Sequence, residues 1–435
     1  MASALSHSPD EIVFQPDLAI LGLGYVGRTL AGVFLKAGLS VSGIDRDPGV
    51  VDRLQTDLDS SQSPGFEPFQ AAWKEGRFKI SAADAAVPEA KAFILCVQTP
   101  LDSHHQPDLT FVKEAGCQVG RALKPGSLVV LESTSYPGTT DEVLVSVLEA
   151  ESCLRAGEDF HVAFSPERTD PGRAIDEAAI PKIVGGCTRE AGARAADLYR
   201  KAFQTVVEVS DARTAEATKI LENVYRCVNI ALVNELKILF QKMGINIWEA
   251  IKAASTKPFG FQPFYPGPGL GGHCIPIDPF YLSWKAREFG MTTRFIELAG
   301  EINIRMPEYV VQRLTEGLSE RGKPLKEAAV LVLGMAYKPG IGDTRESPGL
   351  KIMELLLSRN ARPVYHDPFV SSIECGGKSI HSRDLTDEVL ALSDAAVIVT
   401  DHPGIDYARI VRAVPLVVDT RNATVNIRGE NIVQA

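Results

Sequence analysis

Residues 18–27 read Leu18-Ala-Ile-Leu-Gly-Leu-Gly-Tyr-Val-Gly27, and this stretch decides the fold of the N-terminal part of the chain. Its first four residues form a short apolar run that predicts a buried strand. The pattern after it predicts a helix through Ala37, ended by Gly38 as the C-cap. Three glycines with this spacing between a strand and a helix are typical of a turn that binds the pyrophosphate of a dinucleotide. The stretch therefore predicts a Rossmann domain.

The next predicted strand, at 41–44, ends on Asp45, about twenty residues past the glycines. An acidic side chain at this point binds the ribose hydroxyls of NAD and repels the 2′-phosphate of NADP. The adjacent Arg46 argues the other way, because a cation attracts that phosphate. We expect the cofactor to be NAD. From this turn and strand, the predicted cofactor-binding residues are Gly22, Gly24, Tyr25, Val26, Gly27, Asp45 and Arg46.

Apolar runs and helical stretches alternate along the rest of the chain, as parallel sheets require. Further strands are predicted at 93–97, 128–132, 162–164 and 183–184. The longest helical pattern covers 212–243, and a helix of this length is suited to linking two domains. A second α/β unit is predicted from a strand at 329–333, a helix at 350–357 and strands at 364–365, 396–399 and 416–418. The predicted fold class is α/β, with two Rossmann-like domains with parallel sheets joined by a central long-helix domain.

These elements divide the chain into four predicted segments. They are a flexible N-terminal arm at 1–17, an NAD-binding Rossmann domain at 18–205, a central helical domain with a cysteine loop at 206–321, and a second Rossmann-like domain at 322–435. The first turn of the second Rossmann-like domain, Gly334-Met-Ala-Tyr-Lys338, lacks the dinucleotide spacing of glycines. We therefore expect that domain to bind a nucleotide other than a second NAD.

Composition narrows the classes of protein that the chain can be. Its 435 residues are 45% hydrophobic and 23% charged, and the formal net charge is −10. This charge opposes nonspecific binding to nucleic acid, and no apolar run is long enough for a membrane span. The N-terminus lacks the basic and apolar regions of a signal peptide. The seven cysteines form no close pairs, which argues against a disulfide framework or a metal site, so we expect a protein of the reducing cytoplasm without a metal.

The segment 265–281 holds Cys274 directly after a cluster of glycines, with Asp278 four residues later. Glycines let the backbone approach a ligand closely, and the prolines of the segment fix its turns, so we expect a loop that exposes a thiol for covalent chemistry. A buried structural cysteine is the alternative, since free cysteine is among the most buried residues. The neighbouring glycines, His273 and Asp278 favour the functional interpretation.

Helical spacing also puts Lys219, Asn223, Arg226 and Asn234 on one stripe of the long helix. The alternative is a solvated face, and it stays open for Arg226 and Asn234.

The chain resembles the UDP-glucose/GDP-mannose dehydrogenases over essentially its whole length. The resemblance rests on Gly22-Leu-Gly-Tyr-Val-Gly27, Gln98-Thr-Pro100, Glu132-Ser-Thr134, Ser165-Pro-Glu-Arg168, Lys219 with Asn223, Gly271-Gly-His-Cys274 with Asp278, and Lys338-Pro-Gly-Ile-Gly-Asp-Thr-Arg345. The segments 165–172, 226–235 and 264–281 are most similar to the UDP-N-acetylhexosamine branch, and within it to UDP-N-acetyl-D-glucosamine 6-dehydrogenases.

This resemblance implies a four-electron oxidation of the C6 alcohol of a UDP-sugar to the uronic acid, with two NAD reduced. The second oxidation would proceed through a thiohemiacetal and a thioester on Cys274. The implied partners are the UDP-sugar, bound by the domain at 322–435, and a second copy of the chain, in a homodimer joined through the central helices. The implied setting is polysaccharide biosynthesis.

The resemblance also implies roles for individual residues. Glu167 would activate the water that hydrolyses the thioester, and Lys219 would stabilise negative charge on the C6 oxygen. The implied catalytic residues are Cys274, Lys219, Asp278, Glu167, Asn223 and Thr134. Further cofactor-binding residues are Thr99, Pro100, Thr134 and Arg345. The implied substrate-binding residues are Glu167, Arg168, Lys219, Asn223, Arg226, Tyr265, Gly271, His273 and Lys338.

Several alternatives stay open from the sequence. Many UDP-glucose enzymes carry a second acidic residue four positions after the first, but Pro171 occupies that position here, which weakens the assignment of hydrolysis to Glu167 alone. UDP-N-acetylmannosamine and UDP-glucose are the alternative substrates, because one hydroxyl direction separates the epimers. A two-electron dehydrogenase that uses only Lys219 and Asn223 is another possibility. A noncatalytic nucleotide-binding protein is the alternative from a different class.

Overall fold

The computed structural model describes residues 14–59, 66–82, 86–102, 106–169, 176–272 and 274–435. The predicted N-terminal arm thus lies mostly outside the described residues, as do Pro171 and His273. The chain divides into two compact units, Met1–Ile220 and Leu221–Ala435, which we call the N-terminal and C-terminal units. The predicted boundaries near residues 205 and 321 stay predictions.

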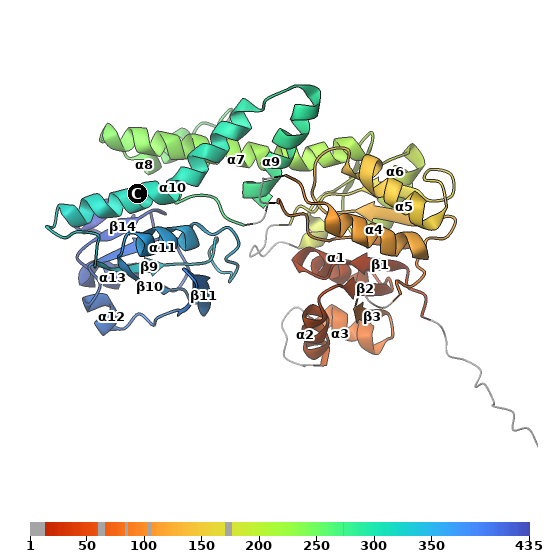
Figure 1. Cartoon of the computed structure of the whole chain (residues 1–435), viewed down its shortest axis with the longest axis horizontal. Coiled ribbons are helices and arrows are strands. Elements are labelled where there is room, and N and C mark those ends of the chain that lie inside the picture. The colour runs from red at the N-terminus through yellow and green to blue at the C-terminus, as the bar shows by residue number, and fades with distance from the viewer. Residues whose placement is uncertain (1–13, 60–65, 83–85, 103–105, 170–175, 273) are drawn as a thin grey trace, which may run out of the picture. The chain divides into compact units, whose positions relative to one another are not determined.

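The N-terminal unit is built on a sheet that has eight strands among the described residues, in the order β3-β2-β1-β4-β5-β6-β7-β8 (Figure 1). Its strands are β1 (Leu18–Leu21), β2 (Val41–Asp45), β3 (Phe78–Ala82), β4 (Ala92–Leu95), β5 (Leu128–Leu131), β6 (His161–Phe164), β7 (Lys182–Gly186) and β8 (Val206–Glu208). Its helices are α1 (Tyr25–Lys36), α2 (Pro48–Asp59), α3 (Glu67–Lys74), α4 (Thr110–Ala122), α5 (Val145–Ser152), α6 (Arg189–Tyr199), the π-helix η1 (Thr139–Leu144) and the 3-10 turn η2 (Glu177–Ala179).

Strand order reverses between β1 and β4, which both pair with parallel neighbours. In open α/β sheets, ligands bind beyond the carboxyl ends of the strands at such a switch point. The turns that follow β1, β2, β4 and β5 are therefore the ones positioned to bind a cofactor.

The first of these turns depends on its glycines. Gly22 has φ +92°, and a Cβ atom there would lie 2.4 Å from the carbonyl oxygen of Cys96. A Cβ on Gly27 would lie 1.8 Å from the carbonyl oxygen of Gly22, so glycine permits the close packing of α1 on the turn. Around Gly24, by contrast, nothing lies within 4 Å of the Cβ position. The turn is thus tightly packed on the protein side and open where a pyrophosphate would approach the N-terminus of α1.

One part of the predicted sheet is wrong in direction. Strand β7 runs antiparallel to β6, with Phe164 opposite Gly185, while β8 pairs parallel with β7. A parallel connection needs a crossover, usually a helix. Between β6 and β7 the described residues contain only the three-residue turn η2, so the chain reverses beside β6.

The long helix α7 (Ala212–Lys242) agrees with the predicted pattern at 212–243, and Gly244 with φ +70° follows it. The boundary between the two units in the sequence falls within this helix, after Ile220. In the C-terminal unit the further helices are α8 (Ile247–Ala254), α9 (Cys274–Ala286), the 3-10 turn η3 (Arg287–Phe289), α10 (Arg294–Ser319), α11 (Pro348–Ser358), α12 (Asp387–Ala391) and α13 (Tyr407–Ala413).

The second sheet is parallel, in the order β10-β9-β13-β14-β15 (Figure 1). Its strands are β9 (Ala329–Leu333), β10 (Arg362–His366), β13 (Ala395–Ile398), β14 (Val417–Asp419) and β15 (Ile432–Gln434), and β11 (Ser372–Cys375) pairs with β12 (Lys378–His381) as a separate hairpin. The second half of α10 packs on this sheet through Val310, Leu314 and Leu318. The predicted fold class is confirmed. The chain has two α/β units, and the long helices α7 and α10 come between the two sheets along the sequence.

Among the helices that the structure describes, none combines the length and the apolar composition that a membrane-spanning helix needs.

Candidate active site

The second strand ends as predicted on Asp45, whose carboxylate organises the neighbouring turn. Oδ2 accepts the backbone N–H of Leu23 at 2.7 Å, and Oδ1 accepts that of Asp47 at 2.9 Å. The Arg46 guanidinium lies 3.1 Å from Glu114 and over the ring of Phe111. Arg46 therefore already has an acidic partner, which reduces its attraction for a 2′-phosphate.

The loops after β4 and β5 are joined by a hydrogen bond between two predicted cofactor residues. The hydroxyl of Thr99, which is buried, donates to the carbonyl of Thr134 at 2.7 Å. Pro100 follows Thr99, and its carbonyl accepts the N–H of Asp108 at 2.9 Å. These contacts bring the Thr99-Pro100 and Thr134 segments together at the switch point of the sheet.

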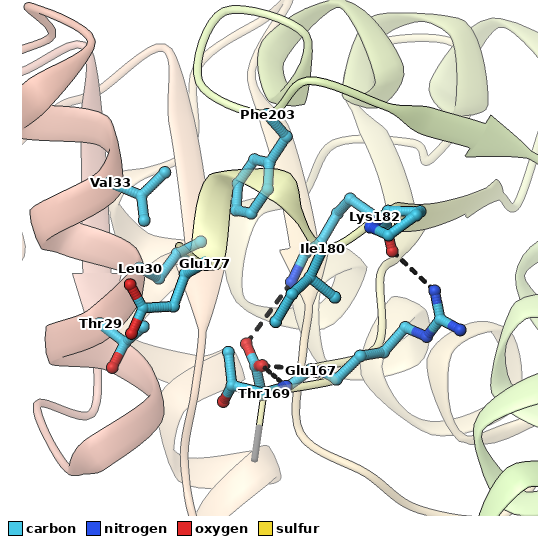
Figure 2. Close-up of a pocket in the computed structure, with 11 residues that line it drawn as sticks. Thr29, Leu30, Val33, Glu167, Thr169, Glu177, Ile180, Lys182 and Phe203 are labelled. Atoms are coloured by element: carbon cyan, nitrogen blue, oxygen red, sulfur yellow. Dashed lines mark hydrogen bonds and ion pairs between the residues drawn. The ribbon is translucent and has the colours of Figure 1, made fainter. Parts of the chain in front are cut away.

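Glu167 lines a pocket of the N-terminal unit that also contains residues of α1 and of the segment 177–182 (Figure 2). Its Oε1 accepts the backbone N–H of Arg168 at 2.7 Å and that of Thr169. Arg168 donates from Nη1 to the carbonyl of Pro181 at 2.7 Å. Burial alone raises the pKa of Glu167, but Lys182, the Thr169 N–H and Lys219 outweigh burial and leave this pKa below its ordinary value.

The charged residues behind Glu167 were not predicted as site residues from the sequence. Lys182, the first residue of β7, donates to Glu132 at 2.7 Å and lies 3.7 Å from Glu167 (Figure 2). Tyr199 on α6 donates to the other oxygen of Glu132. The available signal was a lysine at the start of an apolar run, together with an acidic residue directly after the buried strand β5.

The polar residues of α7 and α9 form a buried pair in the C-terminal unit. Asn223 donates from Nδ2 to Oδ2 of Asp278 at 2.5 Å, and both side chains are at most 3% exposed. Cys274 is the first residue of α9, and Asp278 follows about one helical turn later along the chain. Lys219 lies one turn before Asn223 on α7 and is also buried.

The sequence predicted a loop around Cys274, but the structure has a helix from Cys274 onward. The helix α9 begins at Cys274 and includes Pro276 and Pro279. Pro276 lies in the first helical turn, where the N–H groups have no partner within the helix, whereas Pro279 lies inside the helix and removes one of its backbone hydrogen bonds. The glycine-rich part therefore ends before α9, and Cys274 stands at the N-terminus of a helix.

Amides of α7 and α10 hold the glycine-rich loop on one side. The N–H of Gly267 donates to Oδ1 of Asn234 at 2.9 Å, and Asn234 in turn donates to Asn303 at 2.9 Å. Asn234 thus belongs to the buried stripe, whereas Arg226 is exposed and does not share its environment. The burial of Asn303 was not predicted, since a single asparagine in a helix carries no distinctive pattern.

The turn at 337–346 holds the other side of this loop. Gly272 has φ +82°, and its N–H donates to the carbonyl of Arg345 at 2.9 Å. A Cβ on Gly271 would lie 2.5 Å from the Cβ of Tyr337, so the loop and the turn are in close contact. The predicted ligand residue Lys338 is half-buried beside Tyr337.

The remaining predicted residues of the C-terminal unit are more exposed. Arg345 pairs with Asp343 at 2.6 Å, and its side chain is 59% exposed. Tyr265 stacks on Trp248 with ring centroids 5.6 Å apart.

No group of three or more His, Cys, Asp or Glu side chains within the described part of the chain is arranged to hold a metal ion.

Comparison with known proteins matches all three regions of the chain to one family. The NAD binding domain of the UDP-glucose/GDP-mannose dehydrogenase family matches residues 17–203, its central domain 213–305, and its UDP binding domain 331–426. The UDP-N-acetyl-D-mannosamine dehydrogenase of Pyrococcus horikoshii is 36% identical over 413 residues, which cover 93% of this chain and 95% of that protein. The UDP-N-acetyl-D-glucosamine 6-dehydrogenase of Pseudomonas aeruginosa is 38% identical over 357 residues, covering 82% and 83%.

A solved structure of a UDP-D-ManNAc dehydrogenase from Pyrococcus horikoshii has the same fold. Its TM-score is 0.87 at 33% identity, and the match covers 97% of this chain and 98% of that one. The glycine turn after β1 fits NAD, because the turn is closed toward Cys96 and open around Gly24. The chain therefore belongs to the UDP-glucose/GDP-mannose dehydrogenase family and is an NAD-dependent nucleotide-sugar dehydrogenase whose C-terminal unit contains the family's UDP binding domain.

Proposed function

We propose that the chain oxidises the C6 alcohol of a UDP-N-acetylhexosamine, with UDP-N-acetylglucosamine favoured, to the uronic acid in two NAD-dependent steps. The observation that carries the proposal is the start of α9, where Cys274 stands one helical turn from the buried Asn223–Asp278 pair. The first turn of a helix favours an anionic group, which suits a thiolate that attacks an aldehyde. Bound NAD supplies the hydride acceptor for each oxidation.

Each step then has a residue that moves or holds charge. Lys219 would stabilise negative charge on the C6 oxygen, while Asn223 and Asp278 orient the polar groups around the reacting carbon. Cys274 would form a thiohemiacetal with the aldehyde, and the second oxidation converts this adduct into a thioester. Glu167 would take a proton from the water that hydrolyses the thioester, because its lowered pKa keeps the carboxylate ionised at neutral pH.

The remaining predicted residues are proposed to bind the two ligands. Thr99, Pro100, Thr134 and Arg345 would contact the cofactor, and Arg168, Arg226, Tyr265, Gly271 and Lys338 the UDP-sugar. His273, outside the described residues, is proposed for the same site. The cytoplasmic location and the role in polysaccharide biosynthesis stay predictions.

The choice of the N-acetylglucosamine epimer rests on the similarity of the segments 165–172 and 264–281 to that branch and on the relative from Pseudomonas aeruginosa. UDP-N-acetylmannosamine is the second candidate, because the 36% identical relative from Pyrococcus horikoshii carries that substrate in its name. Either substrate carries the acetamido group that UDP-glucose lacks.

A homodimer through the central helices is also proposed. Leu221, Tyr225, Leu232 and Leu239, which we call the α7 stripe, recur at helical spacing and are between 45% and 67% exposed. Phe295 and Leu298 on α10 are 79% and 54% exposed. Apolar side chains that gather on a helix and face solvent in one chain are typical of a surface covered by a partner.

The Cys274→Ser variant should reduce the rate of overall NADH formation at least about a thousandfold, because an oxygen ester is a poorer intermediate than a thioester. The wild type should form two NADH for each sugar consumed, and NAD affinity should be unchanged in the variant. Cys153→Ser, at an exposed cysteine, is the matched control and should keep wild-type activity. Wild-type turnover of Cys274→Ser would refute the covalent mechanism, and one NADH per sugar in the wild type would indicate a two-electron enzyme.

Asp45 should make NAD at least about tenfold more efficient than NADP, since its carboxylate would face the 2′-phosphate. Asp45→Asn should narrow this ratio of kcat/KM values. Arg46→Ala, whose guanidinium is held by Glu114, should leave the ratio within about threefold of the wild type. Equal efficiency of wild-type enzyme with both cofactors would show that Arg46 dominates.

UDP-N-acetylglucosamine should be the most efficient substrate when it is compared with UDP-N-acetylmannosamine and UDP-glucose by NADH release and by the mass of the acid product. UDP-glucose should be at least about tenfold less efficient, because an acetamido pocket leaves a buried donor unpaired at a cost of about 1–3 kcal/mol. A preference for the manno epimer would change only the choice within the branch. A preference for UDP-glucose would overturn the branch.

Leu232→Glu should raise the dimer dissociation constant at least about tenfold, since in each subunit a charge would replace a leucine that the proposed interface covers. Analytical ultracentrifugation measures the change, and Lys378→Glu on the exposed hairpin strand β12 is the control. An unchanged dimer in Leu232→Glu would place the interface elsewhere.

A further inference from the structure

A buried group of charges lies behind Glu167 in the N-terminal unit. The ammonium of Lys182 is 2.7 Å from Oε2 of Glu132 and 3.7 Å from Oε2 of Glu167. The side chains of Lys182 and Glu132 are 4% and 0% exposed, whereas that of Glu167 is 14% exposed. Of these three side chains, Glu167 is therefore the one with the best access to water.

The two oxygens of Glu167 have different surroundings. Oε1 accepts the backbone N–H groups of Arg168 and Thr169, which fixes the plane of the carboxylate. Oε2 faces Lys182 across 3.7 Å, a distance at which the charges interact without a tight hydrogen bond (Figure 2). Oε2 is thus the oxygen that can accept a proton from water while it remains under the influence of a fixed cation.

Lys182 is itself held rigidly. Its ammonium lies 5.3 Å from the ring centre of Tyr199 and 5.5 Å from that of Phe203. The hydroxyl of Tyr199 also donates a hydrogen bond to Glu132. The ring of Tyr199, the carboxylate of Glu132 and the ammonium of Lys182 thus contact one another. A buried cation in such a position cannot follow Glu167 if that side chain rotates.

The surroundings fix the ionisation of the group. Burial lowers the pKa of Lys182, but Glu132 and Glu167 outweigh burial and raise it above its ordinary value. Burial raises the pKa of Glu132 in spite of Lys182. The other titratable groups that act on Glu167 or on Lys182 are Lys219 on α7 and Cys96 after β4.

We propose that Lys182 is a positioning residue for hydrolysis of the thioester: shared between Glu132 and Glu167, it holds Glu167 in the ionised form and in one orientation. This inference rests on the proposed function, in which Glu167 is the base. In that step the water oxygen bonds to the thioester carbon, the carbon–sulfur bond breaks and the sulfur leaves on Cys274. One water proton passes to Glu167 and then to the thiolate or solvent, and no electrons are transferred to an oxidant.

The two partners of Lys182 make the proposal testable by the sign of a pH shift. Hydrolysis needs ionised Glu167, so its rate falls as the pH drops through the pKa of that carboxylate. We call this fall in rate at low pH the acid limb of the pH–rate profile. Lys182→Met removes the nearby cation and should move the acid limb to higher pH by about one unit or more. Glu132→Gln removes the competing carboxylate and leaves Lys182 to Glu167, so the limb should stay or move downward.

The measurement is the fraction of enzyme that carries the sugar thioester. Enzyme, UDP-N-acetylglucosamine and NAD are mixed at pH values from 3 to 9, because the pKa of Glu167 lies below its ordinary value, and after quenching in acid the intact protein is weighed by mass spectrometry. Glu167→Gln should accumulate the adduct at every pH. Lys182→Met should accumulate it up to a higher pH than the wild type, with about tenfold slower release below its shifted limb.

Two further variants separate charge from folding. Lys182→Arg keeps a positive charge beside Glu167. The pH at which hydrolysis falls off should therefore stay within about half a pH unit of the wild-type value. If Lys182→Met does not fold with Glu132 left unpaired, the double variant Lys182→Met with Glu132→Gln removes both buried charges. This double variant should still shift the limb upward, because Glu167 has lost its cation.

Each outcome decides a separate question. Adduct in Glu167→Gln with an unshifted limb in Lys182→Met, or in the double variant, would overturn the role of Lys182 and leave the proposed function intact. Equal upward shifts in Lys182→Met and Glu132→Gln would identify a merely structural ion pair. No adduct in Glu167→Gln would overturn Glu167 as the base, and with it the role of Lys182.

Discussion

The requirement that buried polar side chains find partners organises this structure through one helix. Glu216, Asn223, Asn234 and Lys237 of α7 are each at most 3% exposed, and a buried polar group without a hydrogen bond is costly. Each of them binds a different segment. In the N-terminal unit, Glu216 accepts N–H groups of Gly138 and Thr140. In the C-terminal unit the other three bind Asp278 of α9, Asn303 with the glycine-rich loop, and the carbonyl of Ala435. Burial raises the pKa of Glu216 to about 7 although it accepts these bonds.

The sequence predicted the elements whose pattern is local. The strand at Leu18–Leu21 and the helix α7 have the expected limits, because an apolar run before a glycine turn and a long helical period are both strong signals. The strands β3 and β15 and the hairpin β11–β12 were not anticipated, since they are short and partly exposed. The direction of β7 was wrong because it depends on what connects β6 and β7, and that connection carries no helical pattern of its own.

The residues of the candidate site also fall into those that were predicted from the sequence and those that were not. Motifs identified Asn223 and Asp278, which the structure joins, and Thr99 and Thr134, which it also joins. Lys182, Tyr199 and Asn303 were missed because their partners lie 50 to 76 residues away along the chain. Pairing at that distance is decided by the sheet order and by helix packing, so a single sequence without its fold does not reveal it.

The contact between the glycine-rich loop and the turn at 337–346 has a mechanical consequence. Gly271 and Tyr337 leave no room for a side chain between them, and Gly272 is tied to the backbone of Arg345. These two segments therefore cannot separate without breaking this hydrogen bond and this packing contact. The backbone of the turn carries the hydrogen bond to Gly272, so any change in the conformation of the turn would alter the end of the glycine-rich loop as well.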